Sequence, residues 1–322
     1  MSEISNVSYI NVSGRNRSRR KTPIITVIFI ITIAFILIRK ATTQNSSGQE
    51  ILHAQVETGL FTPSPLPTVK TSKKTPLLPQ IEKIISEKSG TFSVYVVDLS
   101  TGQEYALNSE MIVDAASVNK IPVLASLYYF ADKGEIDLEK IIVPQPKDIQ
   151  DYGTGSIRYD KPGSPYSIKT LARLMMEKSD NTAAYLLASH IVGLDKIEER
   201  TKEWGLTQTD MYKNTTSNKD VALLLTKMYK GEITSKALTA EMLDFMDKSD
   251  FDDRIHKGLP EGITVYHKTG DAVGKIHDTG IVDLPDNPYY IGIFTTDMTS
   301  VEDAKVVMGE ISKVVFDYMR ES

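Results

Sequence analysis

The fold and the chemistry of this chain depend on one stretch, which reads Ala115-Ala116-Ser117-Val118-Asn119-Lys120-Ile121-Pro122-Val123-Leu124. It predicts the start of a buried helix in which Lys120 follows Ser117 by three positions, so that both side chains share a face. The Lys120 amine can then reach the Ser117 hydroxyl, which is a weak nucleophile until an adjacent base accepts its proton. Pro122 is compatible with a helix here because the first turn has no intrahelical N–H bonds to lose.

The same spacing also occurs where no catalysis is expected. Ser18-Arg19-Arg20-Lys21 repeats it within a basic N-terminal segment. A serine at a helix N-terminus with a solvated lysine one turn later gives the same pattern without any chemistry. The interpretation of Ser117 therefore depends on other motifs in the chain.

Composition excludes several classes of protein. The 322 residues are 41% hydrophobic and 25% charged, as in an ordinary globular protein, and the net charge of −5 argues against nucleic-acid binding. There is no cysteine, which rules out disulfides, thiolate metal sites and cysteine nucleophiles. The five histidines are scattered without a His-x-x-x-His pair, so the sequence predicts neither a zinc site nor a cofactor.

The N-terminal region predicts a membrane anchor. Residues 1–22 form a basic tail, and the apolar run from Pro23 to Ile38 would span about 24 Å as a helix. Flanking Lys and Arg side chains can extend this span, so we expect a transmembrane signal-anchor over 23–40. No small-residue cleavage site is evident, which favours an anchor over a cleaved signal peptide. The excess of basic residues before the run predicts a cytoplasmic N-terminus, with everything after residue 40 outside the cell membrane.

Residues 41–76 are rich in Thr, Ser and Pro and predict a linker that holds a domain away from the bilayer. We expect the folded domain to cover 77–322. It begins with a helical period over 77–87 and two strands over 91–99 and 103–108. The predicted helices of the middle section cover 117–132, 136–141, 167–178, 182–192, 194–204, 217–230 and 235–247.

Strands return towards the C-terminus, over 263–268, 276–284 and 289–296, and a helix over 301–319 ends the domain. Strands at both ends of the sequence and helices in the middle indicate an α+β fold. We expect an antiparallel sheet with flanking terminal helices, an all-α lobe built from the middle section, and a cleft between the two.

Two further motifs fall where the cleft walls are expected. Ser179-Asp180-Asn181 lies between two predicted helices, where Ser, Asp and Asn are also the ordinary capping residues. Lys268-Thr269-Gly270 ends a predicted strand, where a solvated edge strand would also suit it. Each motif alone has this ordinary structural explanation, but the three together, in this order and on these elements, are harder to explain that way.

The set Ser-x-x-Lys, Ser-Asp-Asn and Lys-Thr-Gly resembles that of penicillin-binding proteins and class A β-lactamases. The resemblance covers roughly residues 77–320, and His277-Asp278-Thr279-Gly280 in the next strand also looks like this family. It implies that Ser117 is acylated, that Lys120 is the base once burial and cationic neighbours lower its pKa, and that Ser179 relays a proton.

The resemblance also implies the substrate-binding residues. Asn181 would bind the substrate amide, and the Lys268-Thr269-Gly270 strand would bind its carboxylate beside the backbone N–H groups of Ser117 and Asp271, which match the oxyanion hole. Because adjacent strand residues face opposite ways, Lys268 and Thr269 can serve one site only if their strand lies at the sheet edge. The loop 151–155 would form the rim, with Tyr152 as a candidate contact.

One feature of class A β-lactamases is missing from the sequence. Those enzymes use a glutamate on an Ω-shaped loop, after Ser-Asp-Asn, to activate the water that deacylates the enzyme. The corresponding stretch here, residues 204–217, contains no glutamate, and its only carboxylate is Asp210. Without such a base the acyl-enzyme should persist, so that penicillins acylate the protein and are released slowly.

Several functions remain open at this stage. We expect a monomeric, membrane-anchored serine hydrolase acting on peptidoglycan stem peptides such as D-Ala-D-Ala, with β-lactams as trapping ligands. The alternatives are a working β-lactamase in which Asp210 or another route serves deacylation, a sensor that reports β-lactams without turnover, and a catalytically inactive cell-wall-binding domain. The intact Ser117, Lys120 and Ser179 argue against the last.

Overall fold

A computed structural model describes residues 76–321. The predicted basic tail, the predicted anchor over 23–40 and nearly all of the predicted linker lie outside these residues, so those predictions stay untested. Within 76–321, no helix is both long enough and apolar enough to cross a membrane.

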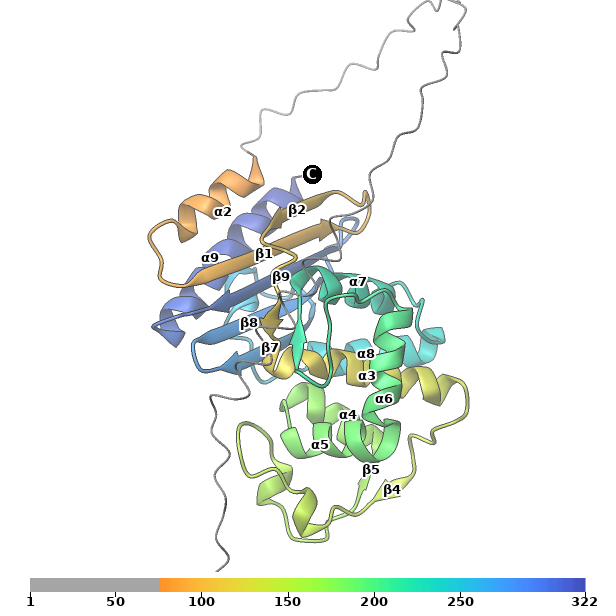
Figure 1. The fold of residues 1–322 in the computed structure, drawn as a ribbon. Coiled ribbons are helices and arrows are strands. Elements are labelled where there is room, and N and C mark those ends of the chain that lie inside the picture. Colours follow the sequence, from red (N-terminus) through yellow and green to blue (C-terminus); the bar gives the residue numbers. More distant parts are fainter. Residues whose placement is uncertain (1–75, 322) are drawn as a thin grey trace, which may run out of the picture. The chain divides into compact units, whose positions relative to one another are not determined.

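The centre of the described part is a five-stranded antiparallel sheet with the order β2-β1-β9-β8-β7 (Figure 1). Its strands are β1 (Thr91–Asp98), β2 (Glu104–Leu107), β7 (Val265–Ala272), β8 (Lys275–Val282) and β9 (Tyr289–Thr296). The pairing of β1 with β9 joins the two ends of the sequence, as predicted. Strand β7 lies at one edge, which is the position that the Lys268-Thr269 argument requires.

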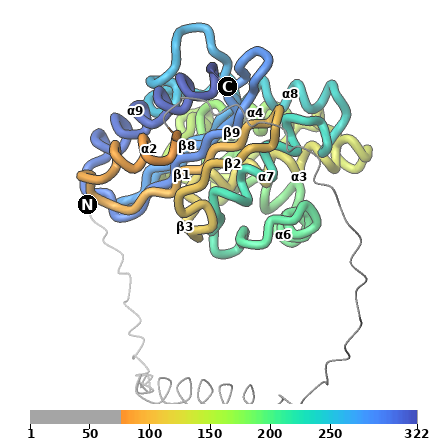
Figure 2. The backbone as a smooth tube through the Cα atoms, turned by 90° about the horizontal axis from the view of Figure 1, so that it is seen from above, coloured from red at the N-terminus to blue at the C-terminus, as the bar shows by residue number. Residues whose placement is uncertain are grey.

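Both faces of the sheet are covered. Alternate residues of β1 show this directly, because Val94 and Val96 belong to one hydrophobic core and Tyr95 to the other. Helices α2 (Leu77–Ile85) and α9 (Val301–Arg320) pack on the first face, where Ser300 caps α9 by accepting the Asp303 N–H at 3.2 Å. Figure 2 shows these two helices together on one side of the strands.

The other face carries the helical lobe (Figures 1 and 2). Its elements are α3 (Lys120–Asp132), α4 (Ile168–Glu177), α5 (Asn181–Tyr185), the π-helical η4 (Leu186–Val192), α6 (Leu194–Glu203), α7 (Asn218–Tyr229) and α8 (Lys236–Asp247). These bounds agree with the predicted helices to within a few residues. Glycines with positive φ at 193, 205 and 231 follow helix ends.

Small elements complete the chain. They are β3 (Val113–Asp114) with β6 (Thr215–Thr216), β4 (Ile141–Ile142) with β5 (Tyr166–Ser167), and the 3₁₀ turns η1 (Ala116–Asn119), η2 (Pro146–Asp148), η3 (Ile157–Tyr159) and η5 (Ile255–Gly258).

Two predictions of local structure are wrong. The predicted helix over 136–141 is a turn that leads into β4, because the β-branched Ile141 and Ile142 pair with Tyr166 and Ser167 instead. The strand carrying Lys268 does not end at Gly270 but continues to Ala272, because its pairing with β8 extends that far. In addition, the nucleophile helix starts as the 3₁₀ turn η1 and becomes α-helical only at Lys120.

Candidate active site

A cavity of about 560 Å³ lies between the helical lobe and strand β7, where the cleft was predicted. It brings together seven of the nine predicted site residues, from segments far apart in the sequence. The described residues that line it are Ala116, Ser117, Lys120, Tyr152, Gly153, Thr154, Ser179, Asn181, Asn214, Phe251, Thr269 and Asp271. Lys268 and Gly270 are absent from this lining and lie next to it.

Ser117 is presented by a strained backbone. Ala116 has a φ of 47°, in the left-handed region that a non-glycine residue occupies at a cost of about 1–3 kcal/mol. Two contacts hold it there: its N–H donates to Asp114 Oδ1 at 3.1 Å, and its carbonyl accepts from Asn214 Nδ2 at 3.3 Å. Ser179 and Asn214 also have positive φ, so three such residues meet at one cavity. Strain of this kind is typical of functional sites.

Lys120 is a buried amine without a carboxylate partner. Its Nζ lies 2.6 Å from the Ser179 carbonyl oxygen, 3.1 Å from Ser179 Oγ and 2.8 Å from Asn181 Oδ1, and all three partner atoms are uncharged. Burial and repulsion from Lys268 hold the pKa of Lys120 well below its usual range. The geometry therefore favours a neutral amine that can accept a proton.

The Ser179 hydroxyl joins two buried amines. It lies 3.1 Å from Lys120 Nζ and 3.0 Å from Lys268 Nζ, and the side chain is almost fully buried. The loop that places it is fixed by Asp180, which caps α5 by accepting the Ala183 N–H at 2.9 Å. Asp180 also accepts the N–H groups of Ser156 and Ile157, at 2.6 and 2.9 Å. The capping role and the position of Ser179 are thus compatible, because Asp180 is the capping residue.

Asn181 links the lysine to the cavity rim. Its Oδ1 accepts from Lys120, and its Nδ2 donates to the Tyr152 carbonyl at 3.0 Å. Tyr152 lies on the predicted rim loop with its side chain 64% exposed. Gly153 lets the loop approach Asn181, because a Cβ at this position would lie 2.5 Å from the Asn181 amide. The rim is therefore built against the Ser-Asp-Asn turn.

Lys268 is fully buried on the lobe side of edge strand β7. Besides Ser179 Oγ, its Nζ contacts the Thr269 carbonyl at 3.1 Å and lies 5.8 Å from the centre of the Phe251 ring. Burial lowers the pKa of Lys268 to about 7; Arg254 acts in the same direction, and Asp278 opposes it. Desolvation therefore disfavours the charged form of this amine, which lies next to the cavity.

Gly270 acts through packing. A Cβ there would lie 2.9 Å from the Ala115 carbonyl and 3.1 Å from Val118 Cγ2, so only glycine lets β7 approach the nucleophile turn this closely. The neighbouring Asp271 reaches the cavity, and its Oδ2 accepts from Arg254 Nη2 at 2.7 Å.

Asp210 is turned away from this site. Its carboxylate pairs with Lys213 Nζ at 2.7 Å and accepts the N–H groups of Tyr212 and Lys213, within the turn that precedes β6. Lys213 lowers the pKa of the Asp210 carboxyl, which keeps it ionised. Among the described residues that line the cavity, Asp271 is the one carboxylate and none is glutamate.

Sequence reasoning missed three contributors, namely Asn214, Phe251 and Ala116. Asn214 fastens the nucleophile turn: its side chain bonds to Asn119 Nδ2 at 3.1 Å, and its carbonyl accepts the Ala115 N–H at 2.8 Å. No motif spacing marks these residues. Asn214 lies within residues 204–217, the stretch that also contains Asp210.

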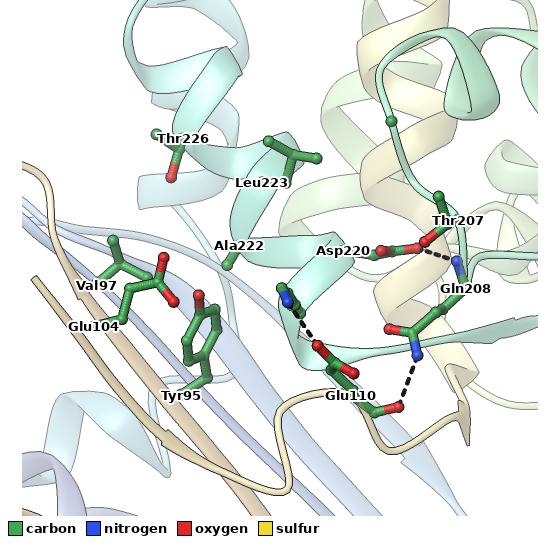
Figure 3. Close-up of a pocket in the computed structure, with 12 residues that line it drawn as sticks. Tyr95, Val97, Glu104, Glu110, Thr207, Gln208, Asp220, Ala222, Leu223 and Thr226 are labelled. Atoms are coloured by element: carbon green, nitrogen blue, oxygen red, sulfur yellow. Dashed lines mark hydrogen bonds and ion pairs between the residues drawn. The ribbon is translucent and has the colours of Figure 1, made fainter. Parts of the chain in front are cut away.

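A second cavity, of about 420 Å³, lies between β1, β2 and α7 (Figure 3). It contains none of the predicted site residues. Its charged groups have partners in the fold, since Lys219 pairs with Glu110 at 2.6 Å and Asp220 accepts the Gln208 N–H at 2.7 Å. We therefore assign the chemistry to the Ser117 cavity.

Comparisons with known proteins identify the family of this chain. Residues 76–319 match the beta-lactamase enzyme family, and the chain belongs to that family. It is a serine hydrolase with the α+β fold of class A β-lactamases. Beta-lactamase VEB-1 of Pseudomonas aeruginosa is 21% identical over 74% of this chain and 89% of its own length. Beta-lactamase 3 of Bacillus cereus is 23% identical over 74% and 80%.

Among solved structures, PBP-A is similar at 28% identity and a TM-score of 0.71, over 76% of this chain and 96% of that one. A point mutant of PBP-A has been solved as its acyl-enzyme complex with penicillin G and matches at 27% identity, with a TM-score of 0.71, over 76% and 97%. This chain is thus similar both to β-lactamases and to PBP-A.

Proposed function

We propose that this protein is a membrane-anchored serine acyl-enzyme that acts on peptidoglycan stem peptides outside the cell membrane and is trapped by β-lactams. The observation that carries the proposal is the Ser179 hydroxyl, shared at 3.1 and 3.0 Å by the buried amines of Lys120 and Lys268 beside Ser117. Such a network can take a proton from a nucleophile and return it to a leaving nitrogen.

Each residue then has a defined role. Ser117 attacks the carbonyl carbon as neutral Lys120 accepts its proton, and Ser179 passes a proton to the leaving nitrogen. The backbone N–H groups of Ser117 and Asp271 stabilise the developing oxyanion. Asn181 binds the substrate amide. The charge of Lys268 and the hydroxyl of Thr269 bind its carboxylate, and Tyr152 contacts it at the rim.

The cavity lining supports slow release of the acyl group. Hydrolysis of the ester by the route of class A β-lactamases needs a carboxylate that activates water, and Asp271, which is engaged by Arg254, is the one carboxylate among the described residues that line the cavity. Asp210 does not line the cavity, and its carboxylate is paired with Lys213 instead. A protein of this kind reacts once with a β-lactam and stays acylated, which agrees with the acyl-enzyme seen for the PBP-A mutant.

Anchoring and location belong to the same proposal. The basic tail, the apolar segment over 23–40 and the linker over 41–76 would place a monomeric domain in the cell wall, where stem peptides are.

The test uses the full-length chain in detergent with a chromogenic cephalosporin, following colour and protein mass together. We expect one equivalent of colour and a stable adduct, lost in Ser117→Ala. The matched control is Ser18→Ala, which removes the serine of the other Ser-x-x-Lys sequence and should leave the adduct unchanged. Linear turnover would instead establish a β-lactamase, and the absence of an adduct on the unmodified chain would refute an acyl-enzyme of either kind.

A D-Ala-D-Ala peptide assay then tests the substrate. Release of D-alanine by the unmodified chain and not by Ser117→Ala supports the peptidase. Adduct formation without peptide cleavage would contradict it and leave the sensor function. Membrane association is tested separately by deleting residues 1–40, which should release an acylation-competent protein into the soluble fraction.

A further inference from the structure

Behind the active-site strand lies a second cluster of titratable side chains. His267 immediately precedes Lys268 on β7 and therefore faces the opposite side of the sheet. Its neighbours there are Asp278 of β8, and Asp252 and His256 from the segment that leads into and through η5. The mechanism proposed above uses none of these four side chains.

Three of them can share one ion. His267 Nε2 lies 3.2 Å from Asp252 Oδ1, and His256 Nδ1 lies 3.5 Å from the same oxygen. The three ligand atoms all lie within 4.8 Å of one another. Ligands of a tetrahedral zinc ion, with bonds of about 2.0–2.2 Å, are separated by about 3.3–3.6 Å. The 3.5 Å separation falls within this range and the 3.2 Å separation lies just below it.

The fold supplies an outer partner for the buried ligand. His267 Nδ1 lies 2.8 Å from Asp278 Oδ1, and both side chains are fully buried. A hydrogen bond from Nδ1 to a carboxylate directs Nε2 towards a metal, as in carboxylate–histidine–zinc sites. Asp278 is itself fixed by the Ile255 N–H at 3.1 Å. Gly280 makes room for this arrangement, since a Cβ there would lie 2.6 Å from His267 Cβ.

His256 provides an independent indication. Its Nδ1 is buried and has no hydrogen-bond partner among the described residues, because its approach to Asp252 does not make a hydrogen bond. A buried, unpaired ring nitrogen is costly unless something binds it. The Asp252 side chain is 53% exposed, so an ion and a water as fourth ligand can enter from solvent.

We propose that Asp252, His256 and His267 bind a zinc ion on the face of β7 opposite to the active site. Two imidazoles and one carboxylate, with an open fourth position, are a ligand set that suits Zn²⁺. On binding, the Nδ1 proton stays on His267 and is donated in a hydrogen bond to Asp278. Any proton on Nε2 passes to solvent. The ion would tie the 252–256 segment to β7. Phe251, which precedes this segment, lines the active-site cavity.

The test is zinc titration of the full-length chain, first freed of metal with a chelator, by calorimetry at neutral pH. Co²⁺ serves as the spectroscopic probe, because a tetrahedral site gives intense visible absorption. We expect one equivalent to bind tightly and the unfolding temperature to rise. His256→Ala and Asp252→Asn should abolish tight binding, and both change partly exposed residues, so folding should persist. Asp278→Asn should weaken binding by about 10–100-fold.

The matched control is His190→Ala. His190 also lies beside a carboxylate, Asp148, at 3.4 Å, but outside the cluster, and this variant should bind zinc like the unmodified chain. Failure of the unmodified chain to bind zinc would refute the proposal. Equal affinity in His256→Ala and Asp252→Asn, or an equal loss in His190→Ala, would also refute it. Acylation of Ser117 is measured separately, so neither outcome bears on the proposed function.

Discussion

Two neighbouring residues on β7 show how one strand serves two opposite environments. Lys268 faces the helical lobe, where its partners are a hydroxyl and a carbonyl, and burial lowers its pKa to about 7. His267 faces the other side, where burial alone would lower its pKa but Asp278 and Asp252 raise it to about 9. Both side chains are fully buried, so the partners, and not the burial, decide which charge state is favoured.

The two sides of β7 therefore have different roles, reactivity on the lobe side and structural support on the opposite side. On the lobe side, two amines share uncharged acceptors and are kept ready to exchange protons. On the opposite side, charges are paired across neighbouring strands, since His267 of β7 lies 2.8 Å from the Asp278 carboxylate of β8. The first arrangement costs stability and permits chemistry, whereas the second holds the strand in place.

The largest effect on the reactive side is expected from removal of the Lys120 amine. Lys120→Met should slow acylation by about 10²–10⁴-fold, because the general base is lost while the side-chain volume is kept. Stability should not fall, since a desolvated amine is removed. Time-resolved mass spectrometry with penicillin G gives the acylation rate, and urea unfolding gives the stability. An unchanged rate would show that another group takes the Ser117 proton.

Removing a charge from the paired side should act on stability instead. Asp278→Asn leaves His267 with one carboxylate and should cost about 3–5 kcal/mol, as expected when one partner of a buried pair is lost. Urea unfolding with a chelator present measures this cost. Asp210→Asn is the matched control, because its pair with Lys213 is solvent-accessible, and neither stability nor deacylation should change. Slower loss of the acyl group in the control would show that Asp210 has a catalytic role.

The contact between β7 and the nucleophile turn is tested by Gly270→Ala. The added methyl group would meet the Ala115 carbonyl and Val118, so β7 and the nucleophile turn must separate. Overpacking of this kind costs about 1–3 kcal/mol, and misplacement of Ser117 should slow acylation as well. Stability and acylation rate are measured on the same preparation. A loss of stability with a normal rate would mean that the close approach serves folding alone.

The last prediction is a gradual change of the acylation rate with pH. Lys120 must be neutral to accept a proton, so the acylation rate should rise about tenfold per pH unit below the pKa of Lys120 and then level off. Because burial and Lys268 lower that pKa, the plateau should begin well below 10.5, the ordinary lysine value. Stopped-flow measurements across pH follow this limb. Its persistence in Lys120→Met would assign it to another group.

Much of the fold was predictable because local patterns and tertiary packing agree. The strands near both ends and the helices 167–178, 194–204 and 217–230 have clear periods, and the structure has them within a few residues. The helix over 136–141 failed because its β-branched end pairs with a distant segment, which a local period cannot show. The continuation of β7 past Gly270 was not predicted. A glycine interrupts the β-rich sequence pattern, but it does not interrupt the backbone pairing of β7 with β8.

The sequence by itself determined the three motifs and hence the class of chemistry, because residue type and order define what groups are present. Tertiary structure alone decided that two lysines share the Ser179 hydroxyl, that Asn214 holds the nucleophile turn, and that Asp210 lies elsewhere. It also gathered Asp252, His256 and His267, although no His-x-x-x-His pair occurs in the chain. The physical reason is that charge state and coordination depend on distances between side chains from separate segments, which only folding sets.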